Sequence, residues 1–154
     1  MNMSRFSNIL KCAAVALLAA ACTPTAKIRM TIDSAPSSEV VIKLLNINQY
    51  EVLDTLKTDA SGNFSYKVNV EEGQPEFVYI FRNDRRIASL LLSAGDNVNV
   101  KADTLGNYTV EGSEESAKLA VVEQEYSAAQ NRFRTIAQQI ETASEDQAAA
   151  LTQA

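Results

Sequence analysis

The stretch FSYKVNV, residues 64–70, alternates apolar and polar side chains at every step. Successive side chains of an extended strand point to opposite faces, so this alternation predicts a strand with one face buried and the other in water. Residues 27–33 and 97–102 show the same alternation. Half-buried strands of this kind are typical of antiparallel sheets, which can leave one face solvated.

Two further stretches are apolar on both faces, VVIKLL at 40–45 and FVYIF at 77–81. Such strands are typical of sheet centres, and we interpret RIASLLL, residues 86–92, as a third central strand. Turn-forming Asn, Asp, Gly and Pro residues interrupt the chain roughly every 10 to 14 residues. The pattern predicts a mainly β fold, either an antiparallel β-sandwich or a partly open barrel, of about seven to eight strands between residues 26 and 111.

After Gly112 the pattern becomes that of one long C-terminal α-helix. Ser113 is a suitable N-cap, and Glu114 and Glu115 would lie where the helix dipole favours negative charge. Apolar residues then recur at alternating steps of three and four, which predicts one apolar stripe. The stripe consists of Leu119, Val122, Tyr126, Ala129, Phe133, Ile136, Ile140 and Ala143.

The stripe needs a partner, because an isolated helix of this composition is marginal in water. We favour packing against the sheet or against a following domain. A dimeric coiled coil is the alternative, which the two alanines weaken. Because the helix is too long to lie along one small sandwich, we expect the part around Phe133, Ile136 and Ile140 to be exposed in this chain. Residues 113–154 are therefore interpreted as an amphipathic helix or a linker to a missing downstream domain.

The N-terminal stretch LLAAACTPTAK, residues 17–27, indicates a processing site. The apolar run at 12–21 is too short to span a bilayer, which needs about 20 apolar residues, but it has the length and the basic flank of a signal-peptide core. The residues before Cys22 resemble the bacterial lipobox, although Ala19 stands where leucine is usual. An ordinary signal peptidase, the alternative, would leave Cys22 as a free thiol.

Four segments follow from this interpretation. Residues 1–21 are predicted to be a lipoprotein signal peptide, and residues 22–26 a tether that begins with lipidated Cys22. Residues 27–112 form the antiparallel β domain, and the helix follows. Acyl chains on Cys22 would attach the protein durably to a membrane, because each buried CH₂ contributes about 0.8 kcal/mol.

The composition argues against catalysis by the chain as given. Cleavage before Cys22 removes Arg5 and Lys11, which leaves 12 basic residues against 19 acidic ones and disfavours nucleic acid and anionic lipid surfaces as partners. There is no histidine, and Cys12 and Cys22 are the only cysteines. With Cys12 removed and Cys22 acylated, no thiol remains for a Cys-x-x-Cys pair or a zinc site. We therefore expect no catalytic, cofactor-binding or metal site.

Three longer stretches occur in a fixed order: DTLKTDASGNFSY (54–66), LLLSAGDNVNV (90–100) and VEGSEESAKL (110–119). Together they resemble the small β domain of unknown function that precedes thioredoxin-like domains of the AhpC/TSA type in envelope lipoproteins of Bacteroidota-type bacteria. The resemblance covers about residues 26–130. It implies a thiol–disulfide context, although the Cys-x-x-Cys domain itself is absent from this chain.

The resemblance implies a lipid-anchored, non-catalytic N-terminal module of a cell-envelope thiol–disulfide oxidoreductase, which positions the redox domain. The alternative is a free-standing envelope lipoprotein that binds a protein or glycan through its β surface. In either case we expect the periplasmic face of a Gram-negative envelope. A thioredoxin-like domain or another envelope protein is the expected partner of the strongest stripe residues, Tyr126, Phe133, Ile136 and Ile140.

Three smaller groups of residues have both a functional and a structural interpretation. Asp59, Ser61 and Asn63 imitate the start of a calcium loop, but no bidentate Glu closes it, and a hairpin turn explains them better. The arginines Arg82, Arg85 and Arg86 could bind an anion, but a solvated hairpin tip is the favoured interpretation. The strand aromatics are interpreted as core rather than as a ligand platform; they are Tyr50, Tyr66, Phe77, Tyr79, Phe81 and Tyr108.

Overall fold

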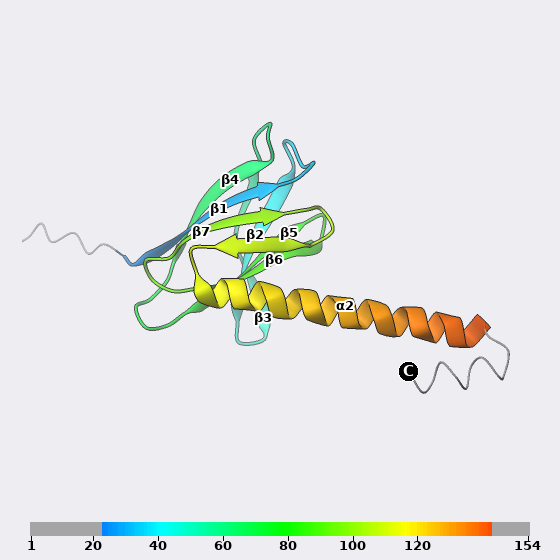
Figure 1. Cartoon of the computed structure of the whole chain (residues 1–154). Coiled ribbons are helices and arrows are strands. Elements are labelled where there is room, and N and C mark those ends of the chain that lie inside the picture. The colour runs from blue at the N-terminus through cyan, green and yellow to red at the C-terminus, as the bar shows by residue number, and fades with distance from the viewer. Residues whose placement is uncertain (1–22, 143–154) are drawn as a thin grey trace, which may run out of the picture.

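A computed structural model describes residues 23–142 and shows two four-stranded sheets with one long helix (Figure 1). The elements are β1 (Thr25–Ile32), β2 (Glu39–Asn46), β3 (Gln49–Lys57), β4 (Asn63–Asn69), β5 (Glu76–Arg82), β6 (Arg85–Leu92), β7 (Asn97–Ala102), β8 (Tyr108–Glu111) and α2 (Glu114–Thr142). One sheet has the order β4-β1-β7-β8 and the other β3-β2-β5-β6. The predicted mainly β fold is confirmed in its sandwich form, with the helix after it.

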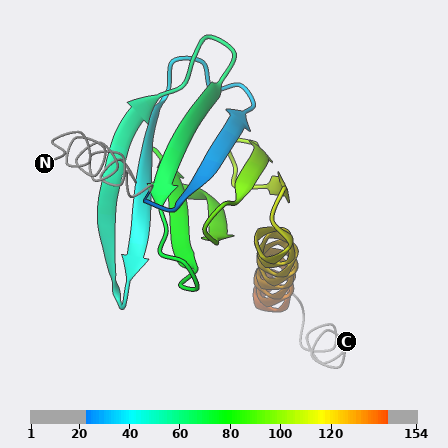
Figure 2. The ribbon, with the colours of Figure 1, turned by 90° about the vertical axis from the view of Figure 1, so that its left-hand side faces the viewer.

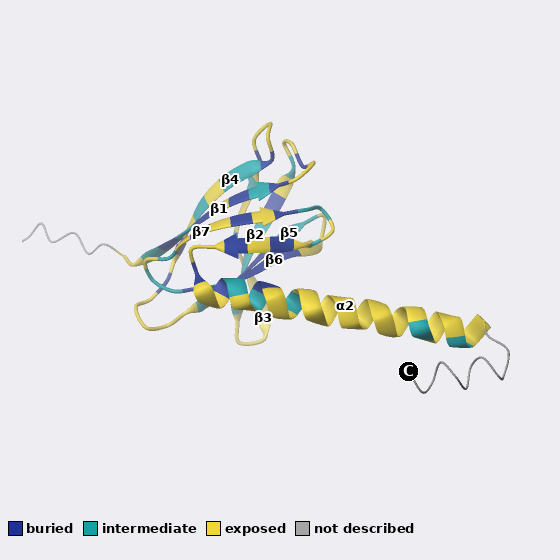
Figure 3. Ribbon diagram, in the orientation of Figure 1, coloured by how far each residue is buried: buried dark blue, intermediate teal, exposed yellow. Residues whose placement is uncertain are grey.

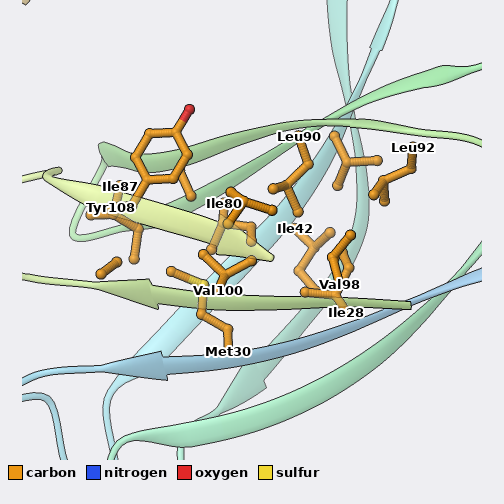
Figure 4. Close-up of a cluster of buried hydrophobic side chains, with 14 of the residues drawn as sticks. Ile28, Met30, Ile42, Ile80, Ile87, Leu90, Leu92, Val98, Val100 and Tyr108 are labelled. Atoms are coloured by element: carbon orange, nitrogen blue, oxygen red, sulfur yellow. The ribbon is translucent and has the colours of Figure 1, made fainter. Parts of the chain in front are cut away.

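The core lies between the two sheets, where the alternating apolar residues meet. Ile28, Met30 and Val98 enter it from one sheet, and Ile42 and Ile80 from the other (Figure 4). Each of these side chains is at most 2% exposed. The period-two alternation therefore predicted the inward faces correctly.

One pair of strands departs from the antiparallel prediction. β1 pairs in antiparallel with β4 but in parallel with β7, so that Ile28 lies beside Val98 and Met30 beside Val100. Most of the strands between β1 and β7 belong to the other sheet, so no hairpin links the two. A chain that returns by such a crossover can enter the sheet in the same direction, which gives a parallel pair.

The β domain begins earlier than predicted. β1 starts at Thr25, so the last two residues of the segment expected to be a tether over 22–26 belong to the sheet. Ala26 is fully buried and pairs with Val68. In the sequence its small side chain resembles a linker residue beside Thr-Pro-Thr, yet it belongs to the hydrophobic core.

The prediction that residues 86–92 form a central strand is wrong. β2 and β5 are the inner strands of their sheet, whereas β6, which contains these residues, is at the edge. The start of α2 contacts β6 and also β8, the edge strand of the other sheet. Figure 2 shows the helix nearly end-on beside the sandwich. The apolar sequence of β6 thus reflects burial partly by the helix.

Two turns share the sequence Asp-x-x-Gly-Asn and lead into the edge strands β4 and β8. In residues 59–63 and 103–107, the Asp side chain accepts hydrogen bonds from the backbone N–H groups two and four residues later, at 2.8–3.0 Å. The Gly has a positive φ in both turns. A Cβ at Gly62 would also collide with the carbonyl oxygen of Ile32. These turns fix where β4 and β8 begin.

Within residues 23–142, no helix has the apolar length needed to cross a membrane.

Candidate functional site

The first turns of α2 attach the helix to the open side of the sandwich. Ser113 accepts a hydrogen bond from the backbone N–H of Ser116 at 3.4 Å, which confirms the predicted N-cap. The buried Ser116 hydroxyl donates to the carbonyl of Leu91 at 2.7 Å and accepts from the N–H of Leu91 at 3.1 Å. A helical serine thus satisfies backbone groups that an edge strand would otherwise leave open.

A second group of polar contacts lies further along the helix. The Tyr108 hydroxyl is 2.9 Å from Glu123 Oε2 and 3.0 Å from the carbonyl oxygen of Ser89, and its single proton can serve one of these acceptors at a time. Arg86 Nη2 is 3.4 Å from Glu123 Oε1, and the Gln124 amide donates to the Tyr108 carbonyl. Burial, followed by the negative charge of Glu123, raises the pKa of the Tyr108 hydroxyl.

These contacts divide α2 into two parts. We call residues 114–124 the root, because its side chains are joined to β6 and β8 by the contacts above and by the buried Ala120. We call residues 125–142 the arm. The arm extends away from the sandwich and is almost entirely exposed (Figures 1 and 3).

The apolar stripe lies on another side of the helix from the residues that pack. Ser116, Ala120 and Glu123 face the sandwich, whereas Tyr126 and Phe133 are 65% and 74% exposed. Ile136 and Ile140 are half-buried, although the arm extends away from the sandwich (Figure 1). The expected exposure of the stripe is therefore observed for Phe133 and only in part for the two isoleucines.

A groove of about 940 Å³ lies in the angle between α2 and the loop that joins β7 to β8. Val122 and Tyr126 of the stripe line one wall, and Leu105 of the loop lines the other. Leu105 is 70% exposed and Val122 is 60% exposed. The groove therefore continues the exposed apolar surface of the stripe onto the sandwich.

The outer face of the β3-β2-β5-β6 sheet carries most of the remaining exposed aromatic surface. Tyr50 packs edge-on against Tyr79 and Phe81, with ring centroids 5.3 and 5.6 Å apart, and Lys43 Nζ lies 4.3 Å from the Phe81 centroid. Tyr50 is 50% exposed and Phe77 is 39% exposed. The interpretation as core is therefore wrong for Tyr50 and Phe77, whereas Tyr79 is buried and Phe81 is half-buried.

For the other two strand aromatics the core interpretation is confirmed. Tyr108 belongs to the buried core, and Tyr66 packs against it. Tyr66 is two residues from the buried Val68 on β4, so both side chains point to the same face of the sheet, toward the core.

The calcium-like residues form a turn, as favoured, but it joins β3 to β4 in the other sheet and is therefore not a hairpin. The Asp59 carboxylate is occupied by hydrogen bonds from its own turn, and the backbone N–H of Asn63 is the main cause of its lowered pKa. Among residues 23–142, no three His, Cys, Asp or Glu side chains gather as a metal site would require. Of the three arginines, Arg86 is held by Glu123 and stacks on Tyr79, so the solvated-tip interpretation does not apply to it.

The sandwich and the start of the helix coincide with a known sequence family. The family described as "Domain of unknown function (DUF4369)" matches residues 26–119, from β1 into the root. The chain belongs to the DUF4369 family. No curated protein matches the chain. The match contains Ser113 and Ser116 and stops before the arm, so the DUF4369 unit is the sandwich together with the first turns that cover its edge strands.

The DUF4369 match confirms a β domain of unknown function at the expected place. Its association with thioredoxin-like domains stays a prediction. Cys22, the predicted lipidation site, and the signal peptide over 1–21 lie outside the described residues, as does the end of the segment over 113–154.

Sequence reasoning missed the residues that join helix and sandwich. Ser116, Tyr108 and Glu123 are ordinary residues in their local sequence, and only the tertiary fold brings them together. The paired Asp-x-x-Gly-Asn turns, in contrast, carry a repeat that the sequence itself displays.

Proposed function

We propose that this DUF4369 protein is a lipid-anchored, non-catalytic module of a cell-envelope thiol–disulfide oxidoreductase, in which it positions the redox domain. The lipid on Cys22 holds the module to a membrane of a Gram-negative envelope, on its periplasmic face. The sandwich serves as the base, and α2 extends from it as a support for the redox domain. The exposed stripe provides the contact surface for a thioredoxin-like domain or another envelope protein.

The observation that carries this proposal is the division of α2 into a fixed root and a free arm. Ser116, Glu123 and Gln124 tie the root to both sheets. An 18-residue arm then continues in the same direction with Phe133 exposed. A long exposed helix is unfavourable by itself, because most helical stability in proteins comes from packing an apolar face. A rooted helix with an uncovered stripe is suited to hold another protein at a defined distance.

The composition supports a non-catalytic role. The whole sequence lacks histidine, the usual proton shuttle near neutral pH, and it has two cysteines, of which Cys22 would be acylated. Reduction of a disulfide requires a thiolate nucleophile, so the thiol chemistry belongs to the partner domain.

The lipid anchor on Cys22 is tested by metabolic labelling with a fatty-acid analogue in cells that express the full chain. The parent chain and Cys12→Ala, the matched control, should take up label and stay with the membrane fraction. Cys22→Ala should lose both properties, because the acyl chains supply the membrane affinity. Equal labelling of Cys22→Ala and the parent would contradict the lipoprotein proposal.

The redox context is tested by cross-linking in intact membranes of a native envelope, followed by isolation of the chain in detergent. We expect the isolated complex to contain a thioredoxin-like domain with a Cys-x-x-Cys pair, and to reduce insulin disulfides. The purified chain alone should not reduce them. A complex without such a domain, or reduction that depends on Cys22 itself, would contradict the proposed function.

A second candidate function is favoured by the exposed aromatic face of the β3-β2-β5-β6 sheet. Tyr50, beside Lys43, and Phe77 are exposed there, and aromatic rings at an accessible surface are enriched in binding sites for proteins. A free-standing lipoprotein that binds a protein or glycan would use this face. Loss of binding in Tyr50→Ala, with Phe133→Ala unaffected, would favour this second function.

A further inference from the structure

The outer face of the β4-β1-β7-β8 sheet carries only polar side chains. In each of these strands, residues that belong to the core or pack against it alternate with residues that point away from the other sheet. In Figure 1 this sheet lies in front of the other one. We call its outward-pointing residues the polar face: Thr25, Lys27, Arg29 and Thr31 of β1; Asn63, Ser65, Lys67 and Asn69 of β4; Asn97, Asn99 and Lys101 of β7; Thr109 and Glu111 of β8.

The polar face is positively charged although the chain as a whole is negative. Lys27, Arg29, Lys67 and Lys101 lie on it against one carboxylate, Glu111, in a chain whose formal net charge is −5. The total charge disfavours an anionic partner for the chain as a whole. A partner that approaches one face, however, responds mainly to the charges on that face, because salt screens those further away. The fold therefore separates charges in a way that the composition does not show.

The cations of the polar face are not neutralised by carboxylates of the described residues. The ion pairs among residues 23–142 all involve α2, and none includes a residue of this face. Lys27 and Lys67 are directly opposite each other in the register of β1 and β4. Like charges at directly opposed positions destabilise a sheet. An anionic partner would relieve this repulsion.

Arg29, in the middle of the polar face, is held in place by neutral groups. Its Nη1 donates to Asn97 Oδ1 at 2.6 Å, and Asn99 Oδ1 lies 3.5 Å from the same nitrogen. Amide oxygens orient the guanidinium without cancelling its charge, and a guanidinium has five N–H donors, so others remain for a ligand. An exposed, oriented guanidinium is well suited to bind a phosphate group.

We infer that the polar face rests on the anionic phospholipid headgroups of the membrane to which the lipid on Cys22 anchors the chain. β1 begins at Thr25, three residues after Cys22, and three extended residues span at most about 10 Å. This length is close to the Debye length of about 8 Å at physiological ionic strength. The anchor therefore keeps the first residues of β1 close to the surface charge of the membrane.

The anchor also favours the membrane over other anionic partners. An acidic protein or polymer has to be captured from solution, whereas the lipid on Cys22 would keep the headgroups at a high effective concentration beside β1. Each basic residue near an anionic membrane surface strengthens binding about fivefold. Four cations on one face therefore contribute more than the single carboxylate removes.

This inference deepens the proposed function and rests on it in one respect, the lipid on Cys22. It fixes how the sandwich is oriented. With the polar face on the membrane, the outer face of the β3-β2-β5-β6 sheet points away from it, because the two outer faces lie on opposite sides of the sandwich. Tyr50 and Phe77 are then open to a partner. The root of α2 contacts β6 and β8, and no residue of the polar face is buried.

The orientation is tested with the lipidated full chain, purified in detergent and reconstituted into vesicles. A fluorophore is attached to Ser65→Cys on the polar face or to Thr55→Cys, an exposed position of β3 in the other sheet, in a Cys12→Ser background. The vesicles contain phosphatidylcholine with or without phosphatidylglycerol, and a small amount of lipid with a quencher on its headgroup. We expect phosphatidylglycerol to increase the quenching of the Ser65→Cys label and high salt to reverse it, while the Thr55→Cys label changes little.

The charge is tested by comparing two exposed lysines of edge strands. Lys67→Glu, on the polar face, should lower the ratio of docked to undocked chains about fivefold or more. Lys57→Glu, the matched control on β3, should leave this ratio unchanged. Lys67→Glu should not lower the melting temperature, because it removes the like-charge pair with Lys27. Loss of docking in a variant of undiminished stability excludes misfolding as its cause.

A chain that stays with the vesicles while both labels respond equally would overturn the inference and leave the lipid anchor intact, as would equal effects of Lys67→Glu and Lys57→Glu. A Ser65→Cys label that responds to soluble polyglutamate but not to phosphatidylglycerol would assign the polar face to an acidic protein and also overturn the inference. A chain that carries no lipid and leaves the vesicles would contradict the lipoprotein proposal, and the inference would fail with it.

Discussion

At the scale of single residues, Ser116 and Tyr108 decide how the helix meets the sandwich. Both are polar groups in largely apolar surroundings, and each is placed by backbone groups of β6. A buried polar side chain stabilises a fold when its hydrogen bonds are made, and removing one partner leaves the other without compensation. The stability of the DUF4369 unit should therefore respond more strongly to these two residues than to most surface positions.

Ser116→Ala should lower the free energy of unfolding by about 1–3 kcal/mol, because the N–H and carbonyl of Leu91 would lose their side-chain partner. Ser127→Ala, an exposed serine of the arm, is the matched control and should change stability little. Urea unfolding of the three proteins measures the difference. Equal stability of all three would show that water replaces the serine without loss.

Tyr108 should make the fold sensitive to alkali. Its folded-state pKa is raised above the unfolded value of about 10, so the unfolded chain loses the proton first as the pH rises. The stabilising contribution is complete below about pH 10 and is lost progressively above it. Unfolding measured between pH 8 and 11 should show a smaller alkaline loss in Tyr108→Phe than in the parent. Identical slopes would contradict the role given to Tyr108.

At the scale of elements, the positions of the strands could be predicted from the sequence, but which strands pair with each other could not. Alternation fixes which side chains of a strand such as 97–102 point inward, because a shift of one residue would expose the whole apolar set. It does not say that β7 lies parallel to β1, since pairing depends on the path of the chain between them. Runs apolar on both faces were equally ambiguous. For β5 the second face carries aromatic residues, of which Phe77 is exposed and Tyr79 is buried, and for β6 it reflects a helix at the edge.

For the helix too, the element could be predicted from the sequence but its contact with the sandwich could not. Its start, its N-cap and its stripe follow from Ser113 and from the spacing of apolar residues. The contact with the sandwich does not, because the small and polar residues Ser116, Ala120 and Glu123 make it. Small side chains let a helix approach a sheet closely, but in a sequence they give no apolar signal.

The two parts of α2 should respond differently to the same substitution. Ala120→Asp places a charge at a position that is 3% exposed and should lower the free energy of unfolding by about 3 kcal/mol or more. Phe133→Asp, at a position that is 74% exposed, should leave the unfolding of the monomeric sandwich unchanged. Thermal unfolding at concentrations where the chain is monomeric measures both. A comparable loss in the two variants would mean that the arm folds back on the sandwich.

At the scale of the whole molecule, the boundary of the sequence family agrees with the boundary seen in the packing. The DUF4369 match ends at residue 119, within the root, and the fixed contacts end at Gln124. From β1 to this point, the described residues share one hydrophobic core. The arm that follows carries the exposed stripe, for which we propose an external partner.

The root of α2 belongs to the fold of the sandwich, whereas the arm does not. Truncation after Glu125, compared with truncation after Gly112, tests this directly by thermal unfolding of monomeric protein. The chain that ends at Glu125 should melt within about 2 °C of the parent, because the contacts of Ser116, Ala120 and Glu123 remain. The chain that ends at Gly112 should melt about 10 °C lower or fail to fold, because the edges of β6 and β8 are uncovered. A clear drop for the chain ending at Glu125 would contradict the division of α2 and make the arm part of the fold.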